Sequence, residues 1–404
     1  MFLSELLPVR DAFRILDENQ RFTGPERVDL LDAYHRVLAE DLVSRFDSPP
    51  FDRSAMDGYA VRAEDTFGSS PGTPSTLRVR DSIGAGEVSK VQVGPGEAVR
   101  IATGAPIPLG ADAVVMEEYT IQDGSEIMVV RPVAPSENVA PAGEDVRCGT
   151  AVLSEGTLLR PQEIAMAASA GHSKVKVFRR PSVRVIVTGN ELVDPSDDLE
   201  PGKIPNSNLY TLNALVESAG GSADPVHLPD DIDIVGKEIE SAAAEYDVIV
   251  TTGGTAISRG DVVVDAVDGL GEVLFHGVAL RPGKPVAFGV VSETPVFMLS
   301  GYPVAAMVQF DVFARYYLLR MQHLDYRHRT VKRRCTAKVA SGPGRTEYLR
   351  ARADDEKVEP VQSRGSGIIR SMVDSNAYIV IDENLEGISA GEECEVLLFD
   401  SMVI

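Results

Sequence analysis

The sequence predicts a multidomain protein in which a central α/β domain is joined to β-rich domains. At 404 residues the chain is longer than one ordinary domain, and its length indicates about two to four. The composition and the predicted secondary structure of the sequence also change along the chain. Gly- and Pro-rich runs of short strands fill 48–145, strands alternate with helices over 181–320, and short strands return from 327 onward.

Helices are expected on both sides of the first β-rich segment. Residues 4–20 and 27–43 carry apolar side chains at roughly helical spacing, and residues 157–171 have a proline near their start and a glycine at their end. Because these stretches flank the β-rich segment, they are expected to form one small helical or mixed domain into which that segment is inserted.

Residues 181–320 are expected to form a parallel sheet with helices on both faces. The apolar runs SVRVIV (182–187) and DVIV (247–250) each lead through a glycine-containing loop into a helical stretch. This alternation is typical of a three-layer α/β/α domain. The last segment favours a small β-barrel, with a β-sandwich as the alternative. The expected domains are 1–47 with 146–178 (helical or mixed), 48–145 (inserted β), 179–325 (central α/β) and 326–404 (C-terminal β-barrel).

Composition argues against several classes of protein. The chain has 39 Lys and Arg against 61 Asp and Glu, and the net charge of −22 disfavours nucleic acid or an anionic membrane as a partner. Cys148, Cys335 and Cys394 form no CxxC pair, and with six histidines a zinc site is not expected. The sequence shows neither a signal peptide nor an apolar run of about 18 residues. We therefore expect a cytoplasmic protein, and the acidity also fits a high-salt cytoplasm.

Two glycine-containing loops are the first candidate binding elements. TGNEL (188–192) and TTGGTAISRGD (251–261) follow the two apolar strands, and ligands of open parallel sheets bind beyond the carboxyl ends of the strands. Glycine lets the backbone approach a ligand, and amides at a helix start favour anions. Neither loop is a Walker A or GxGxxG motif, and the alternative is an ordinary strand-to-helix turn. The candidate binding residues are Thr188, Gly253, Gly254 and Ser258.

Acidic residues are predicted to gather at the same edge of the sheet. Oxygen ligands of this kind suit Mg²⁺ that bridges to a phosphate. The acids are Glu191, Asp230, Asp231 and Asp261. Taken individually, Asp230 and Asp231 are expected to cap the following helix or to remain solvated, in preference to binding a metal.

A basic turn follows the acids in the sequence. Arg281 and Lys284 flank a Pro-Gly pair in RPGKP, just before a predicted strand. Two cations on such a turn suit a phosphate or another oxyanion, and the alternative is a role in surface solubility. We favour the anion site because the chain has few cations.

The inserted β segment contains two further distinctive motifs. SAMDGYAV carries Asp57, whose simplest interpretation is a local Asx turn, and RIATGAPIP carries Thr103 at the tip of a Gly- and Pro-rich loop. To act together with the sheet edge, these residues would have to reach it across a domain or subunit boundary.

Taken together, these segments closely resemble the molybdopterin molybdenumtransferase family (MoeA, and the E domain of gephyrin-type proteins). The motifs PPFDRSAMDGYAV, RIATGAPIP, GEDVR, VTGNEL, NSN, TTGGTAISRGD, RPGKPVAFG and GYPVAA occur in family order over essentially the whole chain. The resemblance implies four domains, a central domain like the molybdopterin-binding adenylyltransferase fold, and a homodimer whose helical or mixed domain mediates dimerisation. The implied active cleft lies between one subunit's central domain and the other subunit's β region.

The resemblance also implies a reaction and the residues that carry it. Molybdate and adenylylated molybdopterin react, the pyrophosphate bond is cleaved, AMP leaves and molybdenum cofactor forms. The implied catalytic positions are Asp57, Thr103, Asp145, Glu191 and Asp261, and the implied Mg²⁺ ligands are Glu191, Asp230 and Asp261. The implied substrate-binding positions are Arg281 and Lys284, for molybdate or phosphate, and Arg350 and Ser366 in the last domain, beside Thr188, Gly253, Gly254 and Ser258.

The chain departs from the common family pattern at several positions. It has SGYPVAA, with Ser300, Tyr302 and Ala305, where PGNPVSA is common, and Asn190 stands where an acid is frequent. Arg259 adds a charge, and His276 and Gly277 precede the basic turn. Tungstate therefore competes with molybdate as the expected oxyanion. Two different functions also stay open: the preceding adenylylation step, whose enzyme would otherwise hand over the substrate, and a non-catalytic dimeric scaffold.

Overall fold

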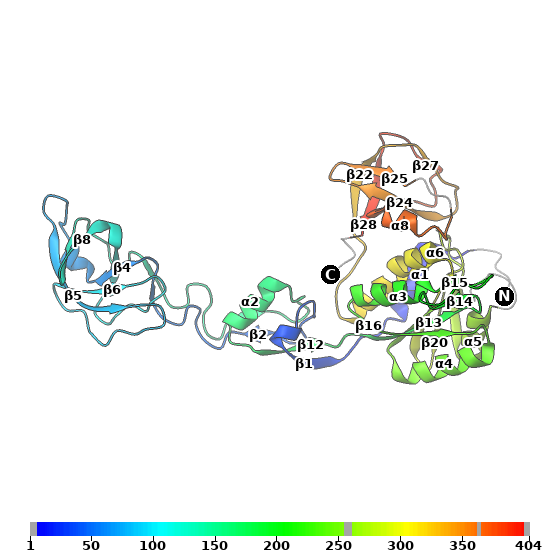
Figure 1. Cartoon of the computed structure of the whole chain (residues 1–404), viewed down its shortest axis with the longest axis horizontal. Helices are drawn as coiled ribbons and strands as arrows, with labels where there is room; N and C mark the ends of the chain where they lie inside the picture. The colour runs from blue at the N-terminus through cyan, green and yellow to red at the C-terminus, as the bar shows by residue number, and fades with distance from the viewer. Residues whose placement is uncertain (1–5, 254–260, 362–364, 400–404) are drawn as a thin grey trace. The chain divides into compact units, whose positions relative to one another are not determined.

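The computed structural model describes residues 6–253, 261–361 and 365–399 (Figure 1). The chain forms two compact units. Unit 1 comprises Met1–Arg27, His35–Ala39 and Lys176–Ile404, and unit 2 comprises Val28–Tyr34 and Glu40–Val175. Among the described residues, no helix combines the length and apolarity needed to cross a membrane.

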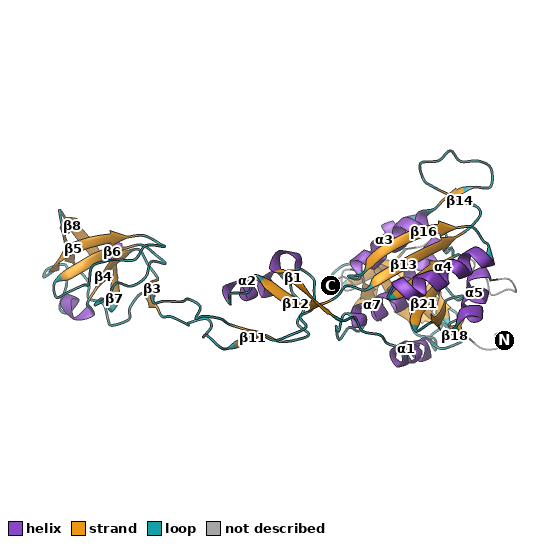
Figure 2. Ribbon diagram, turned by 90° about the horizontal axis from the view of Figure 1, so that it is seen from below, coloured by secondary structure: helices purple, strands orange, loops and turns teal. Residues whose placement is uncertain are grey.

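A six-stranded sheet forms the centre of unit 1, and β16, β13, β21 and β18 of this sheet are labelled in Figure 2. The strand order is β16-β13-β17-β21-β20-β18. The first four strands are parallel, whereas β20 runs antiparallel to both of its neighbours, β21 and β18. The prediction of a parallel sheet was therefore wrong for β20. Only Ser292 and Glu293 separate β20 from β21, and both have positive φ, so the connection is a tight hairpin. The strands are β13 (Ser182–Thr188), β16 (Ser222–Leu228), β17 (Val248–Thr252), β18 (Glu272–His276), β20 (Ala287–Val291) and β21 (Thr294–Leu299).

Helices cover both faces of this sheet, which confirms the three-layer α/β/α arrangement (Figure 1). Successive strand residues point to opposite faces: Val183, Val185 and Val187 pack in one core, while Ile186 packs in the other. On the first face lie α1 (Val9–Glu18), α3 (Ser207–Ser218), α6 (Pro303–Gln309), the π-helical turn η4 (Phe310–Ala314) and α7 (Arg315–Met321); on the second lie α4 (Ile232–Glu245) and α5 (Val262–Leu270).

The C-terminal part of unit 1 is a closed β-barrel, as predicted. Strands β24, β25, β22, β28 and β26 pair in sequence, and β26 pairs again with β24 to close the ring. The two-residue strand β19 (Leu280–Arg281) adds to β24 in parallel. The other bounds are β22 (Thr330–Cys335), β23 (Val339–Ala340), β24 (Thr346–Ala353), β25 (Lys357–Pro360), α8 (Arg370–Val373), β26 (Ala377–Ile381), β27 (Gly387–Ile388) and β28 (Glu393–Leu398).

Unit 2 contains a second six-stranded sheet, with the order β7-β4-β6-β5-β9-β8, in the segment predicted to be all β. Apolar clusters pack on both of its faces. Its strands are β4 (Gly58–Val61), β5 (Ser75–Ile83), β6 (Glu97–Ile101), β7 (Ala113–Met116), β8 (Thr120–Asp123) and β9 (Glu126–Val129). The short elements of this unit are β2 (Leu42–Val43), β3 (Arg53–Ser54), β10 (Val139–Ala140), β11 (Ala151–Leu153) and α2 (Pro161–Ser169).

The helix predicted over 27–43 does not form. Strand β1 (Pro25–Asp29) pairs with β12 (Lys174–Phe178), and only the 3₁₀ turn η1 (Leu30–Asp32) follows. His35, with a φ of 58°, interrupts any helical continuation. Leu31 is 95% exposed and Tyr34 is 48% exposed, so the apolar spacing in this segment does not mark a core-facing helix. Helices α1 and α2 fall within their predicted ranges.

Candidate active site

The loops at the carboxyl edge of the central sheet are held together by buried polar side chains. Asn208, from the NSN segment at the start of α3, donates from Nδ2 to Thr252 Oγ1 at 3.1 Å and to Gly301 O at 2.9 Å. Thr252 in turn donates from Oγ1 to Ser300 O at 2.7 Å. The end of β17 and the turn after β21 are therefore held beside each other.

Thr188 and Gly253 lie together at this edge, as their parallel strands require. Gly253 has a φ of 99°, and a Cβ atom at this position would lie 2.2 Å from Thr188 O. No side chain fits there, so the glycine is required. The Thr188 hydroxyl is buried without a hydrogen-bond partner among the described residues. Two other predicted binding residues of the loop, Gly254 and Ser258, lie outside the described residues.

Asp261 is a buried carboxylate at the start of α5. It caps α5, with Oδ1 accepting from Val264 N at 3.1 Å, and only 4% of the residue is exposed. Its Oδ2 atom is buried and has no hydrogen-bond partner among the described residues. Burial raises the pKa of Asp261 to about 7, because a desolvated carboxylate favours its neutral form. A cation at Oδ2 would stabilise the charged form.

The other acids of the predicted metal set are differently placed. Asp230 Oδ2 accepts from Asn190 N at 3.0 Å, and Asn190 Oδ1 accepts from Asp230 N at 3.3 Å, so these two residues clamp the loop ends after β13 and β16. Glu191 is exposed. Asp231 caps α4, which confirms the capping interpretation for this residue. Within the described ranges, no three His, Cys, Asp or Glu side chains are grouped so as to hold a metal ion.

The basic turn meets the C-terminal barrel through an acid that sequence reasoning missed. Strand β19 sets Arg281 beside Glu347, and Arg281 Nε lies 3.5 Å from Glu347 Oε1. Glu347 is 7% exposed, and its Oε2 accepts from Ser341 Oγ at 2.7 Å. Arg350, on the same strand, is also buried; desolvation lowers its pKa, while nearby Glu347 opposes that shift. Of the two predicted arginines, Arg281 forms an ion pair with Glu347, and Arg350 lies within the electrostatic influence of the same carboxylate. No local sequence pattern reveals Glu347, because its role depends on how β19 joins the barrel.

Gln309 is a second missed residue, and it links two turns of the site. Its Nε2 donates to Gly283 O at 2.6 Å, and its Oε1 accepts from Ser300 N at 2.7 Å. The side chain is completely buried. One polar side chain in the apolar run PVAAMVQF was the available signal, since a buried amide needs partners for both its atoms. Gln309 therefore fixes the RPGKP turn relative to the start of α6.

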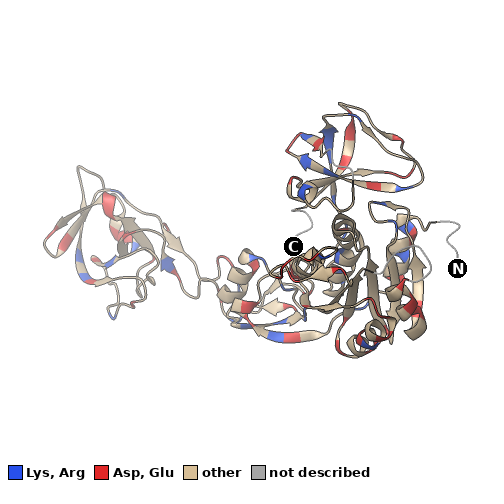
Figure 3. Cartoon of the chain, turned by 45° about the vertical axis from the view of Figure 1, so that its right-hand side comes forward, with Lys and Arg blue, Asp and Glu red and all other residues tan. Residues whose placement is uncertain are grey.

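Lys284 and Ser366 complete the predicted set in unit 1. Lys284 is partly exposed and makes no ion pair with the described residues. Ser366 accepts through its backbone oxygen from Val304 N at 2.9 Å, which ties the 365–369 segment of the C-terminal part to the start of α6. Acidic and basic segments are interspersed within each unit, so the negative charge is not confined to one element (Figure 3).

In unit 2, the two predicted residues Asp57 and Thr103 form a direct pair. Thr103 donates to Asp57 Oδ1 from its backbone N at 2.7 Å and from Oγ1 at 2.9 Å. Asp57 thus binds a residue 46 positions along the chain, in place of the expected local Asx turn. Both residues are exposed. The hydrogen bonds from Thr103 lower the pKa of Asp57, so this carboxylate is an anion near neutral pH.

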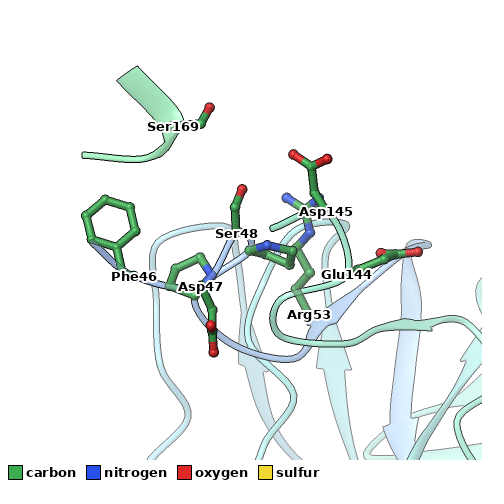
Figure 4. A pocket seen from close by; sticks show the side chains of 9 residues that line it. Phe46, Asp47, Ser48, Arg53, Glu144, Asp145 and Ser169 are labelled. Atoms are coloured by element: carbon green, nitrogen blue, oxygen red, sulfur yellow. The ribbon is translucent and has the colours of Figure 1, made fainter. Parts of the chain in front are cut away.

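Asp145 lies in a separate hollow of unit 2, with a volume of about 530 Å³ (Figure 4). Its backbone N donates to Ser48 O at 3.0 Å, next to a cis peptide bond before Pro49. The hollow is polar and carries charge of both signs. Its lining residues are Phe46, Asp47, Ser48, Pro49, Pro50, Arg53, Glu144, Asp145 and Ser169.

Known families and structures match this chain over nearly its full length. The family models "MoeA N-terminal region (domain I and II)", "Probable molybdopterin binding domain" and "MoeA C-terminal region (domain IV)" match residues 7–171, 184–320 and 332–399. The chain is 36% identical to the molybdopterin molybdenumtransferase of Bacillus subtilis, covering 97% of this chain and 94% of that one. For that of Staphylococcus aureus strain COL, identity is 34%, with 98% and 96% covered. A crystal structure of the molybdopterin biosynthesis MoeA protein from Pyrococcus horikoshii OT3 superimposes with a TM-score of 0.83 at 39% identity, covering 98% and 100%.

Proposed function

The chain belongs to the MoeA family of molybdopterin molybdenumtransferases, and we propose that it inserts molybdate into adenylylated molybdopterin with release of AMP. Its place in molybdenum cofactor biosynthesis follows from the family. The observation that best supports the specific reaction is Asp261 Oδ2, a buried carboxylate oxygen without a donor among the described residues, at the sheet edge and in the same unit as the Arg281 turn. A carboxylate left in this state suits a cation that accompanies a phosphate group.

Mg²⁺ fits Asp261 better than it fits the rest of the predicted acidic set. The orphaned, desolvated Oδ2 supplies one hard oxygen ligand, whereas Asp230 is engaged with Asn190. Mg²⁺ commonly uses one or two carboxylates together with water and substrate phosphate. We propose that Asp261 holds the ion, with Glu191 as the second candidate ligand. When bound, the ion would neutralise charge on the pyrophosphate.

The basic turn is proposed to hold the oxyanion. Glu347 engages Arg281 at Nε, which leaves the terminal nitrogens of the guanidinium to bind two oxygens of molybdate or phosphate. Lys284 adds a point charge. Gln309 holds the turn through the carbonyl of Gly283, so the two cations are pre-positioned and need little reordering when the anion binds.

The residues of unit 2 are proposed to complete the cleft in a homodimer. Asp57, fixed as an anion by Thr103, would act on a substrate held by the partner's central domain. Exposed apolar residues of unit 2, among them Leu31 at 95% and Phe46 at 45%, support a protein contact surface. The division into four domains is also our proposal, as is delivery of the substrate by an adenylylating enzyme.

AMP release tests this function directly. The purified chain is incubated with adenylylated molybdopterin, Mg²⁺ and either molybdate or tungstate. We expect oxyanion-dependent AMP release, and the oxyanion that half-saturates at the lower concentration identifies the metal. Absence of AMP release with both oxyanions would overturn the insertion reaction. Formation of adenylylated product from ATP and molybdopterin would instead favour the preceding step.

A further inference from the structure

Tyr302 exposes an aromatic ring at the carboxyl edge of the central sheet. It lies between β21 and α6, where it occupies the N-cap position without forming a side-chain cap. The residue is 64% exposed, in a chain that has no tryptophan and only 6% aromatic residues. Its backbone N donates to Ser300 Oγ at 3.3 Å, but its hydroxyl has no hydrogen-bond partner among the described residues.

The buried tyrosines of unit 1 behave differently, and even the exposed Tyr210 donates its hydroxyl to Asp194 Oδ2. Tyr317 and Tyr378 are completely buried, and their hydroxyl groups donate to Asn19 O at 2.6 Å and Asp311 Oδ2 at 2.9 Å. A tyrosine that serves packing buries its ring and satisfies its hydroxyl in this way. Tyr302 does neither, so packing does not explain its position.

Gly367 lies near the Tyr302 ring, and Gly301, which precedes Tyr302, packs against Gly253. A Cβ atom on Gly301 would lie 3.4 Å from Gly253 Cα, and one on Gly367 would lie 3.8 Å from Tyr302 Cδ1. The hydrogen bond from Val304 N to Ser366 O brings the Gly367 segment to this place. Because these glycines carry no side chains, a flat molecule can approach the ring without displacing them.

We propose that Tyr302 is a stacking platform for a planar heteroaromatic ring of the substrate. The proposal rests on the proposed function, because adenylylated molybdopterin carries two such rings, the adenine and the pterin. Stacking on an exposed aromatic side chain provides affinity without requiring a hydrogen bond to the hydroxyl. Tyr302 would thus position the organic substrate, while the Arg281 turn binds the oxyanion.

A single engineered tryptophan tests the stacking. Tyr302→Trp gives the chain its only tryptophan, so all tryptophan emission reports on this position. Titration with AMP and, separately, with a free pterin distinguishes the two rings. We expect saturable quenching by at least one of them. Phe67→Trp is the matched control, because Phe67 is 60% exposed but lies in unit 2. Equal changes in both variants, or no change at Tyr302→Trp, would overturn the proposal.

Kinetics provide the second test. Tyr302→Ala is expected to raise the KM for adenylylated molybdopterin about tenfold, or ~1.4 kcal/mol. Tyr302→Phe should retain wild-type KM, and the molybdate concentration for half-maximal rate should not change in either variant. An unchanged KM in Tyr302→Ala, or an equal rise in Tyr302→Phe, would contradict stacking. If wild type released no AMP while AMP or pterin still quenched Tyr302→Trp, the reaction would be wrong and the stacking site would stand.

Discussion

Asp57 in unit 2 and Asp261 in unit 1 are both acids of the predicted site, yet their surroundings are opposite. Asp57 is exposed and accepts two hydrogen bonds from Thr103, which lower its pKa. Asp261 is buried, one of its oxygens has no donor among the described residues, and desolvation raises its pKa to about 7. The two aspartates of the predicted site therefore suit different chemical roles.

This contrast shows how the surroundings assign chemistry to identical side chains. Donors fix the charge on Asp57, so it suits a role as a permanent anion or a hydrogen-bond acceptor. The charge on Asp261 depends on what arrives beside it, because a cation must replace the missing donors. Substitutions at and around the two acids can therefore separate the two roles.

The largest expected effect belongs to Asp261→Asn. The amide keeps the cap to Val264 but cannot neutralise a cation, so we expect AMP release to fall roughly 100-fold. Stability should hold or rise, since a buried unpaired charge is removed. Rate and denaturant unfolding are measured on the same preparation. Asp231→Asn, at the cap of α4, is the matched control and should retain activity. A rate loss explained by unfolding would contradict the assigned role.

A complementation experiment asks whether the two acids serve one cleft. Asp57→Ala and Asp261→Ala chains are each expected to be nearly inactive alone. If the cleft combines unit 2 of one subunit with unit 1 of the other, a mixed dimer contains one cleft with both acids intact and regains part of the activity. Dimers are formed by co-expression with two affinity tags and purified through both. Verified heterodimers without activity would show that the acids do not work across subunits.

A substitution at Thr103 tests whether the hydrogen-bond donors of Asp57 set the pKa of that carboxyl. Thr103→Val removes the Oγ1 donor and leaves the backbone N, so the Asp57 pKa should move up toward its ordinary value of 3.8. We expect the acid limb of the pH–rate profile to shift to higher pH. The rate at neutral pH should also fall about tenfold, because Asp57 stays ionised there but loses one of the two donors that orient it. Thr103→Ser should preserve both. An unshifted acid limb in Thr103→Val would mean that Asp57 ionisation does not limit the reaction.

The fold was largely predictable from the sequence because its periodicity is strong. Alternating apolar strands and helices indicated the three-layer domain, and short strands indicated the barrel. The error over 27–43 arose because Leu31 and Tyr34 are exposed, so their spacing carried no information about burial. The antiparallel β20–β21 pair was missed because Ser292 and Glu293 form the hairpin without a glycine signal.

The placement of candidate residues at the sheet edge was predictable where a motif carries its own geometry, as at Gly253 and Asp261. The pairing of Asp57 with Thr103 was not predicted, because a local Asx turn was expected there. Glu347 and Gln309 were not predictable, because each acts through contacts between distant segments: Gln309 reaches Gly283 from 26 residues away. Sequence reasoning identified the residues proposed to touch substrate, but not those that hold them.

Glu347 shares one property with each of the two aspartates. It is buried, like Asp261, and its carboxylate has polar partners, like that of Asp57. If it holds Arg281 for the oxyanion, Arg281→Ala and Lys284→Ala should each raise the half-saturating molybdate concentration about tenfold. Arg370→Ala is the control, because Arg370 is an exposed cation paired with Asp374 at α8. Molybdate is titrated at constant ionic strength to keep screening equal. An unchanged molybdate dependence with loss of dimerisation would make the turn structural.

The smallest expected effect concerns a basic side chain, His328, whose surroundings also shift its pKa. His328 is half-buried in unit 1, with Nε2 2.8 Å from Val312 O and Nδ1 3.2 Å from Tyr326 Oη. Both nitrogens are satisfied in the neutral ring, and burial lowers the His328 pKa from its ordinary value of 6.5. Two nearby charged side chains also act on this pKa. The negative charge of Asp311 raises it, and the positive charge of Arg315 lowers it.

Because the unfolded chain takes up a proton at His328 before the folded chain does, unfolding free energy should fall as pH falls below 6.5. One such proton changes stability by at most about 1.4 kcal/mol per pH unit. His328→Gln should flatten the curve between pH ~5 and ~7 and leave the slope at higher pH unchanged. Denaturant unfolding across this range is compared with His227→Gln, an exposed histidine whose Nε2 lies 2.9 Å from Gly189 O. Parallel curves for wild type and His328→Gln would show that the His328 pKa is not lowered in the folded chain.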